Sequence, residues 1–232
     1  MEEDPRLQVL QKQWFSNKRC LDIGCNAGLI SIALALRFGT ASMLGVDIDQ
    51  NLIHQSCRNL TAAHSAAHEE LRATQQHGTR DSRQVFSAQR KIAVARRKAL
   101  SQVWFRQEDF VTAEHEPATI DCVTCLSVTK WVHLNGGDAA LQQLFSAVHK
   151  VLTPGGHFVL EAQPWSSYKR ARHKVARQGG SFSPLTDLNM HPSGFCDYLV
   201  KTLGFAFVSE LHVAESAAGF DRPIWVLQRG HS

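Results

Sequence analysis

The stretch that decides the fold is LDIGCNAGLISIALALRF, residues 21–38. It begins with a short apolar strand that Asp22 closes, passes through Gly24 and Gly28, and continues as an apolar run with the length of a helix. Glycine permits a tight turn and lets the backbone approach a bound group closely. A helix that starts at such a turn presents backbone N–H groups to a ligand. The stretch therefore predicts a strand–turn–helix unit whose turn binds a ligand.

The same alternation of strand and helix continues along the chain. We expect strands over 19–24, 42–49, 103–110, 120–128 and 155–165, and helices over 28–38, from about 51, and over 138–152. Asp49 and Asp138 are expected to cap the last two helices. The C-terminal part, 195–230, predicts a helix and then two strands. This order indicates an α/β fold with a mostly parallel sheet, helices on both faces and an antiparallel C-terminal strand pair.

Bulk composition fits a single globular domain spanning 1–232. The chain is 44% hydrophobic and 20% charged, which is ordinary for a domain of this length. No apolar run approaches the roughly 20 residues that cross a bilayer. The first residues, MEEDPRLQVLQKQW, lack the basic and apolar regions of a signal peptide. We therefore expect an intracellular location and read the six cysteines as thiols.

Residues 61–101 interrupt the alternation with a polar run rich in Ala, Gln, His and Arg. We interpret them as a basic insertion, part helix and part mobile loop. Although the net charge is only +4, positive residues gather in two segments, Arg90–Lys98 and Lys169–Arg177. Local patches of this kind favour a polyanionic partner such as RNA, and we expect the first to add RNA affinity. Solvated helix faces are the alternative.

Two pairs of residues have the spacing of metal ligands. Cys122 and Cys125 lie in an expected strand, where residues three apart point to opposite faces, so core packing is the preferred interpretation. His64 and His68 have helical i, i+4 spacing but no third ligand nearby. The sequence therefore predicts no metal site.

The spacing around the turn, G-x-x-x-G, resembles the first motif of class I methyltransferases, which bind S-adenosylmethionine. That resemblance implies a Rossmann-like fold with a seven-stranded sheet. Asp47, at the end of the second strand, can bind both ribose hydroxyls, with Asp49 as the alternative. Asp109 ends the third strand, where it can accept from the adenine amine while Phe110 packs near the ring. All three positions lie at carboxyl ends of strands, where open α/β sheets bind ligands.

A narrower resemblance rests on the blocks LDIGCNAGL, GVDIDQNLI, CLSVTKWVHLNGGD, PGGHFVLEAQPWSSYKR and GFDRPIWVLQR. Together they resemble the RNA 5′-phosphate methyltransferases, the methylphosphate capping enzyme family related to bicoid-interacting protein. The resemblance implies transfer of a methyl group from S-adenosylmethionine to the 5′-terminal phosphate of a small structured non-coding RNA. Lys130 favours the capping branch, which acts on the γ-phosphate of a triphosphate, over the branch that acts on 5′ monophosphates.

The resemblance also implies roles for individual residues. Lys130, His133 and Tyr168 are expected in catalysis. The RNA end is expected to contact Lys130, Trp131, Asn135, Trp165, Lys169 and Arg170, with the tryptophans stacking on the first base. Ordinary packing of both tryptophans and a structural role for His133 remain alternatives. The cofactor set is expected to comprise Arg6, Asp22, Gly24, Cys25, Asn26, Gly28, Asp47, Ile48, Asp109, Phe110 and Leu126.

Two departures from the family pattern stand out. The chain begins without the tyrosine-rich segment that usually precedes the position of Arg6, and Ala162 replaces a proline in the family's EPQPW. A non-catalytic RNA-binding chaperone and a small-molecule methyltransferase are therefore kept as alternatives. The RNA assignment favours a nuclear over a cytoplasmic location and allows an RNA-binding protein partner. The oligomeric state is not determined by the sequence.

Overall fold

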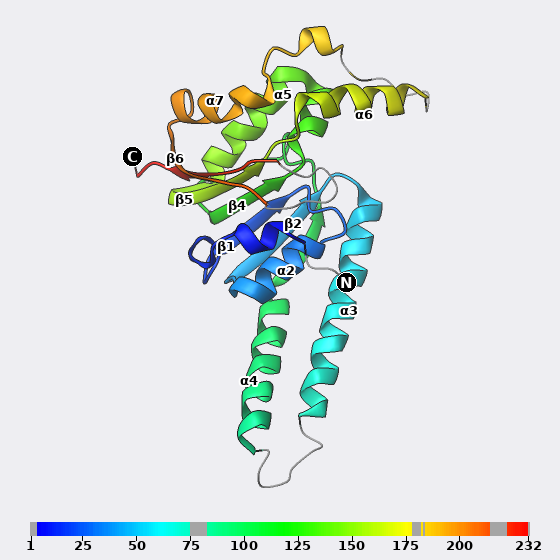
Figure 1. The fold of residues 1–232 in the computed structure, drawn as a ribbon, viewed down its shortest axis with the longest axis vertical. Helices are drawn as coiled ribbons and strands as arrows, with labels where there is room; N and C mark the ends of the chain where they lie inside the picture. The colour runs from blue at the N-terminus through cyan, green and yellow to red at the C-terminus, as the bar shows by residue number, and fades with distance from the viewer. Residues whose placement is uncertain (1–3, 75–82, 178–181, 183, 214–221, 232) are drawn as a thin grey trace. The chain divides into compact units, whose positions relative to one another are not determined.

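The computed structural model describes residues 4–74, 83–177, 182, 184–213 and 222–231 (Figure 1). Its seven strands follow the order β3-β2-β1-β4-β5-β7-β6, and the predicted α/β fold class is confirmed. The strands are β1 (Arg19–Ile23), β2 (Ser42–Asp47), β3 (Val103–Gln107), β4 (Ile120–Leu126), β5 (Leu152–Glu161), β6 (Phe205–Leu211) and β7 (Ile224–Arg229). The chain divides into two compact units, Phe15–Glu108 and Met1–Trp14 with Asp109–Ser232. The single-domain organisation stays a prediction.

In the unit Phe15–Glu108, three parallel strands carry the glycine turn. β1 pairs with β2 and β2 pairs with β3, so that Asp22 lies opposite Gly45 and Gly45 opposite Phe105. Helix α2 (Leu29–Phe38) follows the turn and ends at Gly39, whose φ of 68° suits glycine. The next helix, α3 (Gln50–Ala73), is capped as predicted, because Asp49 accepts from the N–H of Asn51 at 2.8 Å.

The predicted insertion is a helical hairpin. α3 runs without a break past residue 61, and α4 (Arg83–Leu100) returns beside it (Figure 1). Small side chains, Ala67 and Ala93, are buried between two otherwise largely exposed helices. Residue 61, where the polar run begins, lies inside the continuous helix α3, and the bounds of the insertion stay a prediction. The part of the predicted mobile loop at residues 75–82 lies outside the described residues.

In the second unit, β4 and β5 are parallel, and β7 runs antiparallel to both β5 and β6. The apolar run of β4 is buried, including Cys122 and Cys125, which confirms their packing in the core. Figure 1 shows α5 (Thr129–Val151), α6 (Trp165–Arg177) and α7 (Phe195–Lys201) on one side of these strands. The unit also contains α1 (Arg6–Val9) and the short turns η1 (Lys12–Trp14), η3 (Leu185–Asp187) and η4 (Pro192–Gly194).

Helix α5 differs from the prediction at its start. We expected a loop over 129–137 and a helix capped by Asp138, but α5 begins at Thr129 with Val128 at its N-cap. The two halves join at a kink at Gly137, whose φ of 67° and ψ of −167° are open to glycine. Asp138 is not the N-cap, because its carboxylate accepts from His133 and from backbone N–H groups of residues 189 and 190.

Candidate active site

Backbone hydrogen bonds hold the glycine turn against the end of β2. The N–H groups of Gly24 and Cys25 both donate to the carbonyl of Val46, at 2.8 and 3.0 Å. Asp22 is buried and accepts from Ser31 Oγ at 2.5 Å. The carboxylate that closes β1 therefore ties the strand to α2, which positions the turn between them.

Asp47 is joined to this turn through both carboxylate oxygens. Oδ2 accepts from the N–H of Asn26 at 2.9 Å, and Oδ1 accepts from the N–H of Asp49 at 3.0 Å. A carboxylate has about four lone-pair sites, so roughly two remain for the two hydroxyls of a ribose. Asp47 is half-buried and the neighbouring Ile48 is 66% exposed. The residues of this unit therefore fit an adenosyl group.

Gly28 determines how closely the turn packs, and Cys25 places a thiol in it. Gly28 has a φ of 75°, and a Cβ there would lie 2.5 Å from Phe105 Cζ and 2.7 Å from Ser56 Cβ. Only glycine lets α2 start so close to β3 and α3. Burial, and then the carboxylates of Asp22 and Asp47, raise the pKa of the Cys25 thiol. The raised pKa keeps the Cys25 thiol protonated, which does not favour a nucleophilic role, and its contact with the cofactor stays a prediction.

The other predicted cofactor residues lie in the second unit. Asp109 is half-buried, and its Oδ1 accepts from the N–H of Val111 at 3.0 Å. Phe110 is buried and stacks on His115 with ring centroids 4.0 Å apart. Leu126 ends β4 and is 8% exposed. Their contacts with a cofactor stay predictions.

Glu161 is a buried carboxylate at the end of β5 that binds two arginines. Its oxygens lie 3.3 Å from Arg6 Nη1 and 3.3 Å from Arg222 Nη1, and one of them also accepts from the hydroxyl of Ser127. Arg6 is held on its other side by Asp4, at 2.7 and 2.9 Å. Arg6 thus lies between two carboxylates in this structure, and its role toward the cofactor stays a prediction.

Ser127 links Glu161 to the start of α5. Its φ of 63° is left-handed, a conformation that costs free energy for a residue other than glycine. The side-chain amide of Gln163 donates to the Ser127 carbonyl, and its oxygen accepts from the N–H of Lys130 at 3.4 Å. Strain next to a buried hydrogen-bond network is typical of functional sites. These contacts fix the position of Lys130 relative to the end of β4.

Lys130 lies near two other positively charged side chains. Its ammonium lies 4.5 Å from the ring centroid of Trp131, a favourable cation–π distance. Burial, and then the positive charges of Arg222 and Arg170, lower the pKa of Lys130. No carboxylate in the described part of the chain forms an ion pair with Lys130. Three positive groups therefore converge where an anion would be stabilised.

His133 and Tyr168 lie in the core below Lys130. Both side chains have an exposed fraction of 0%. His133 Nδ1 is 3.4 Å from the Tyr168 hydroxyl, and its Nε2 is 2.6 Å from Asp138 Oδ1. Burial raises the pKa of Tyr168, so its phenol stays protonated. The predicted catalytic roles of both residues stay untested, and their contacts favour positioning of α5 and α6.

Asp138 extends this pair into a closed ring of contacts. Its carboxylate accepts from the N–H of Asn189 at 2.9 Å and of Met190 at 3.2 Å. The next residue, His191, packs on Trp165 with ring centroids 4.3 Å apart, and Trp165 packs on Tyr168 at 4.8 Å. Because Tyr168 meets His133, the ring closes. Burial opposes the charge of Asp138, but these hydrogen bonds lower its pKa below 3.8.

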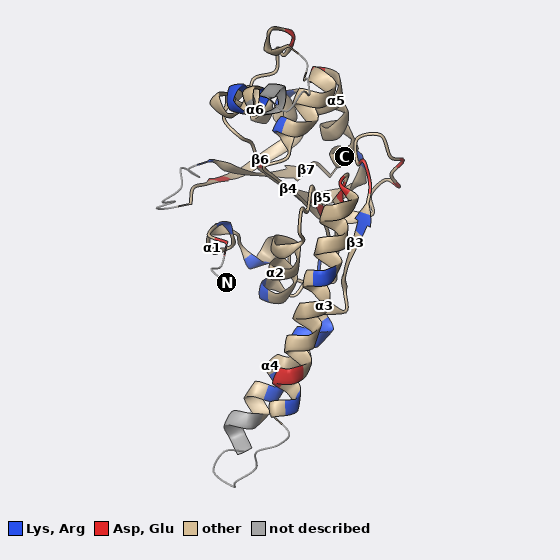
Figure 2. Cartoon of the chain, turned by 90° about the vertical axis from the view of Figure 1, so that its right-hand side faces the viewer, with Lys and Arg blue, Asp and Glu red and all other residues tan. Residues whose placement is uncertain are grey.

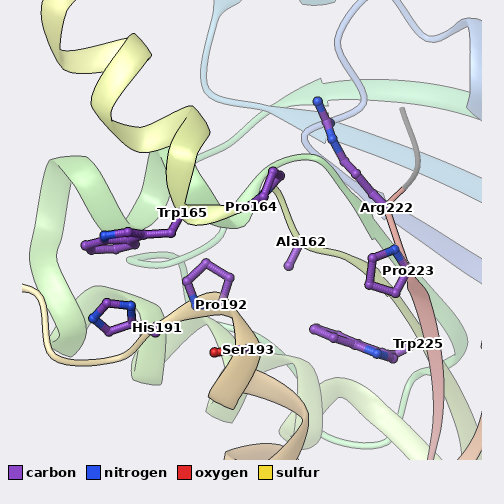
Figure 3. A pocket seen from close by; sticks show the side chains of 9 residues that line it. All are labelled: Ala162, Pro164, Trp165, His191, Pro192, Ser193, Arg222, Pro223 and Trp225. Atoms are coloured by element: carbon purple, nitrogen blue, oxygen red, sulfur yellow. The ribbon is translucent and has the colours of Figure 1, made fainter. Parts of the chain in front are cut away.

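Trp165 and His191 also line a pocket of about 400 Å³ (Figure 3). Most of its other walls are rigid: Pro164, Pro192, Pro223 and the ring of Trp225. Arg222 stands at the border of the pocket and binds Glu161 from there. Figure 3 shows Trp165 and Trp225 on opposite sides of the space. Aromatic and proline walls with a cation at one edge fit a planar ring attached to an anion.

The remaining residues predicted to bind RNA are on helices of this unit. Trp131 is 44% exposed and tilted against Phe182, with centroids 6.3 Å apart. The Asn135 side chain donates to the Trp131 carbonyl at 2.7 Å. Lys169 and Arg170 are exposed on α6. The side chains of residues 174–177, which include two further basic residues of the predicted patch, lie outside the described residues.

Sequence reasoning missed several residues of this site: Ser127, Glu161, Gln163, His191, Arg222 and Trp225. Most stand in the quoted blocks, so their signal was present without a role. Nothing in the sequence indicates that Glu161, at the end of a strand, and Arg222, before a proline, bind each other. For His191 the sequence offers no signal, because it comes near Trp165 only when the backbone N–H of the preceding Met190 binds Asp138.

In the residues that the structure describes, no helix is long and apolar enough to cross a membrane. No group of three His, Cys, Asp or Glu side chains gathers there as a metal site would require. His64 is half-buried and His68 is exposed on α3.

Family models match three parts of the chain. The model of Bicoid-interacting protein 3 matches residues 120–229, that of ribosomal protein L11 methyltransferase matches residues 6–95, and a general methyltransferase domain matches residues 71–160. The first match covers α5, β5 and α6, which carry Lys130, Glu161 and Trp165, and it also includes Arg222.

Several relatives resemble nearly the whole chain. A probable RNA methyltransferase of Arabidopsis thaliana is 39% identical over 98% of this chain and 75% of the relative. The U6 snRNA methylphosphate capping enzyme Amus of Drosophila melanogaster is 35% identical over 97% and 68%. The 7SK snRNA methylphosphate capping enzyme of Homo sapiens is 32% identical over 99% of this chain, which spans 37% of that enzyme.

Solved structures share the fold at low sequence identity. A methyltransferase of Methanosarcina mazei, described as S-adenosylmethionine-dependent, matches with a TM-score of 0.57, 17% identity and 100% coverage of both chains. One of the same description from Mesorhizobium loti matches with a TM-score of 0.59, 14% identity and coverage of 97% and 95%. These similarities bear on the fold alone.

Proposed function

This chain belongs to the Bicoid-interacting protein 3 family of RNA 5′-phosphate methyltransferases, and on that premise we propose that it methylates the 5′-terminal phosphate of a small non-coding RNA. S-adenosylmethionine is the cofactor and S-adenosylhomocysteine the product. The observation that carries the proposal is the half-buried Lys130, which lies over Trp131 and near the positive charges of Arg170 and Arg222, without a carboxylate partner among the described residues. A cluster of this charge suits the γ-phosphate of a 5′ triphosphate better than a monophosphate.

Methyl transfer to a phosphate requires that the phosphate be positioned and that its negative charge be offset. When bound, the cofactor supplies a methyl group on a sulfonium, and a phosphate oxygen forms the new C–O bond as the C–S bond breaks. Because that oxygen is already anionic, no side chain has to remove a proton. Lys130 and the arginines hold the phosphate and offset its charge, which orients one oxygen for attack. Tyr168 stays a neutral phenol and supports α6.

The pocket beside Arg222 supports a contact with the first nucleotide. In the proposed complex, Arg222 and Lys130 hold phosphates while the base enters between Trp165 and Trp225. Stacking on aromatic side chains is worth roughly 1–3 kcal/mol per base and tolerates any base. We therefore expect a Trp165→Ala variant to raise KM for RNA by a larger factor than it lowers kcat.

Methyl transfer to defined RNA ends tests the proposal. One short RNA hairpin is prepared with a 5′ triphosphate, a 5′ monophosphate or a 5′ hydroxyl, and incorporation of label from S-adenosylmethionine is measured. Label on the triphosphate form alone is expected. Label on the monophosphate alone would place the chain with the relatives named RNA 5′-monophosphate methyltransferase, of which the mouse protein is 27% identical. Absence of label with intact cofactor binding would overturn the enzymatic proposal in favour of an RNA-binding chaperone.

The setting of the reaction follows from the same premise. Relatives named for the 7SK and U6 small nuclear RNAs support a nuclear location and a structured small RNA as substrate. A protein partner within a ribonucleoprotein is compatible with this substrate. Tagged protein found in the nuclear fraction, in a complex that nuclease treatment disperses, is the expected result.

A further inference from the structure

Helix α4 is strongly basic. Its sequence, RQVFSAQRKIAVARRKAL, contains six Lys and Arg residues and no Asp or Glu. Successive residues of an α-helix are rotated by about 100°, so residues seven apart share a face. Arg90 and Arg97 are seven apart, as are Lys91 and Lys98, and the two pairs are adjacent. These four residues form one strip, which we call the α4 face.

The α4 face lies beside the packing contacts of the hairpin and is open to solvent. All four side chains are exposed, whereas Ala93 and Leu100, three residues after Arg90 and Arg97, have exposed fractions of 2% and 1%. Figure 2 marks Lys and Arg positions in blue along the ribbon of the helical hairpin. The two residues of each pair are separated by about 10.5 Å along the helix axis. The face is therefore a linear array of positive charge open to solvent.

The charges of the α4 face are not offset by the fold. Arg96, which lies on another side of α4, forms an ion pair with Glu70 at 2.7 Å. None of the four residues of the face forms an ion pair with a carboxylate among the described residues. The four positive charges therefore remain available to an external polyanion.

The composition of the face selects among polyanions. Proteins hold unpaired RNA by stacking its bases on aromatic side chains, and the α4 face contains none. Double-stranded RNA is bound mainly through its phosphates and shape. Membrane-binding basic helices require a broad apolar face with large side chains, and the apolar residue within the α4 face is Val94 alone. The face therefore fits the backbone of an RNA stem.

We propose that the α4 face is a second RNA-binding surface, which holds the double-stranded stem of the RNA whose 5′ end is methylated. The inference rests on the proposed RNA substrate, but it concerns a surface of the unit Phe15–Glu108 that contributes no residue to the cation cluster. Contacts to phosphates carry no sequence information, so the α4 face selects structured RNA over single strands, whatever the sequence of the stem.

Binding and methylation of two RNAs test this inference. One RNA has a 5′ triphosphate on a stem of about 16 base pairs, and the other is a short single-stranded oligonucleotide with the same 5′ end. The face variant replaces Arg90, Lys91, Arg97 and Lys98 with Gln. A matched control replaces the exposed residues Lys12, Arg37, Lys150 and Lys201 with Gln, which removes the same charge elsewhere.

The face variant is expected to lose at least about tenfold in affinity for the stem RNA and to lower the slope of log Kd against log salt by about 3 to 4. Methylation of the single-stranded oligonucleotide should stay within about twofold of the wild type, and the control should keep its stem affinity. Methylation of the oligonucleotide tests the proposed function by itself, so the two proposals can fail separately.

Unchanged stem affinity in the face variant would overturn the inference, as would an equal loss in the control. Vesicles containing phosphatidylserine provide a second arm. Binding of wild-type protein to these vesicles that the face variant loses, together with unchanged affinity for the stem, would assign the α4 face to a membrane surface instead. Circular dichroism of both variants confirms that each retains its helices.

Discussion

Arg222 donates from Nη1 to Glu161 Oε1 at 3.3 Å, across 61 residues of sequence. The bond brings a cation to the edge of the aromatic pocket and leaves the buried carboxylate shared with Arg6. Because Arg6 is also paired with Asp4, two carboxylates face the two guanidinium groups. Glu161 therefore joins the N-terminal segment to the residues before β7 and positions Arg222 near Lys130.

Replacement of Glu161 with Gln should destabilise the fold. The carboxylate is 3% exposed, and its loss leaves two partly buried guanidinium groups with less compensation. Breaking a buried pair in this way costs roughly 3–5 kcal/mol in the free energy of unfolding. Urea denaturation measures it. The exposed pair of Lys201 and Asp197 is the control, since Lys201→Gln should cost under about 1 kcal/mol. Equal losses would contradict the role of Glu161.

Lys130 should be required for activity and unfavourable for stability. Its pKa is lowered, so folding disfavours the ammonium; this cost is present at neutral pH and disappears as pH rises above the ordinary value of 10.5. Lys130→Met should therefore leave the Tm unchanged or raised while kcat/KM falls at least about tenfold, the equivalent of roughly 1.4 kcal/mol. A lower Tm together with full activity would show that the lysine is structural.

The activity should also depend on pH through Lys130. Because the ammonium binds the phosphate, kcat/KM should fall as pH rises through the lowered pKa, beginning below 10.5. Lys130→Arg keeps its charge throughout this range and should move the fall to higher pH. A profile that is identical in the two proteins would exclude Lys130 as its origin.

Gly28→Ala should be more damaging than Gly39→Ala. Both glycines have left-handed φ values, 75° and 68°, so both substitutions strain the backbone by roughly 1–2 kcal/mol. At Gly28 the new Cβ also meets Phe105 at 2.5 Å, whereas at Gly39 it meets nothing within 4 Å. Overpacking adds typically 1–3 kcal/mol. The difference between the unfolding free energies of the two variants measures the cost of this overpacking. Equal values would show that Phe105 on β3 moves to make room for the new Cβ.

The bond between His133 and Asp138 should be visible in acid unfolding. The pKa of Asp138 is lowered, so its stabilising contribution is present above 3.8 and is lost as pH falls through the lower value. Asp138→Asn should cost roughly 1.5–3 kcal/mol at neutral pH, as expected for hydrogen bonds to a charged group. The difference from the wild type should shrink below pH 3.8. A difference independent of pH would point to packing instead.

The sequence was sufficient for the strands and for the glycine turn. Hydrophobic runs and the Asp49 cap are local signals, so β1 to β4, α2 and the start of α3 lie close to where they were expected. The start of α5 was not predictable in this way. Residues 129–136 contain two β-branched residues, a tryptophan and a histidine, and they become helical because His133, Leu134 and Tyr168 pack in one core. Tertiary packing there overrides local propensity.

The candidate site was predictable in its types of residue but not in its connections. Lysine, tryptophan and acidic positions stand out in the quoted blocks, and the fold brings several of them together. The bonds from Glu161 to Arg6 and Arg222 join segments 155 and 61 residues apart. No periodicity or spacing encodes such pairs, because they form only when β5 is placed beside its partners.

The closed ring that passes through His133, Asp138, His191, Trp165 and Tyr168 restricts how this sequence can change over generations. Four of its links join side chains, and the link between Asp138 and His191 passes through the backbone N–H of Met190. A change of size or polarity at one position therefore leaves at least one neighbouring side chain mismatched. Substitutions that persist should therefore arrive in compensating sets. Among descendants of this chain, these five positions should vary together or not at all, while exposed neighbours such as Lys169 drift independently.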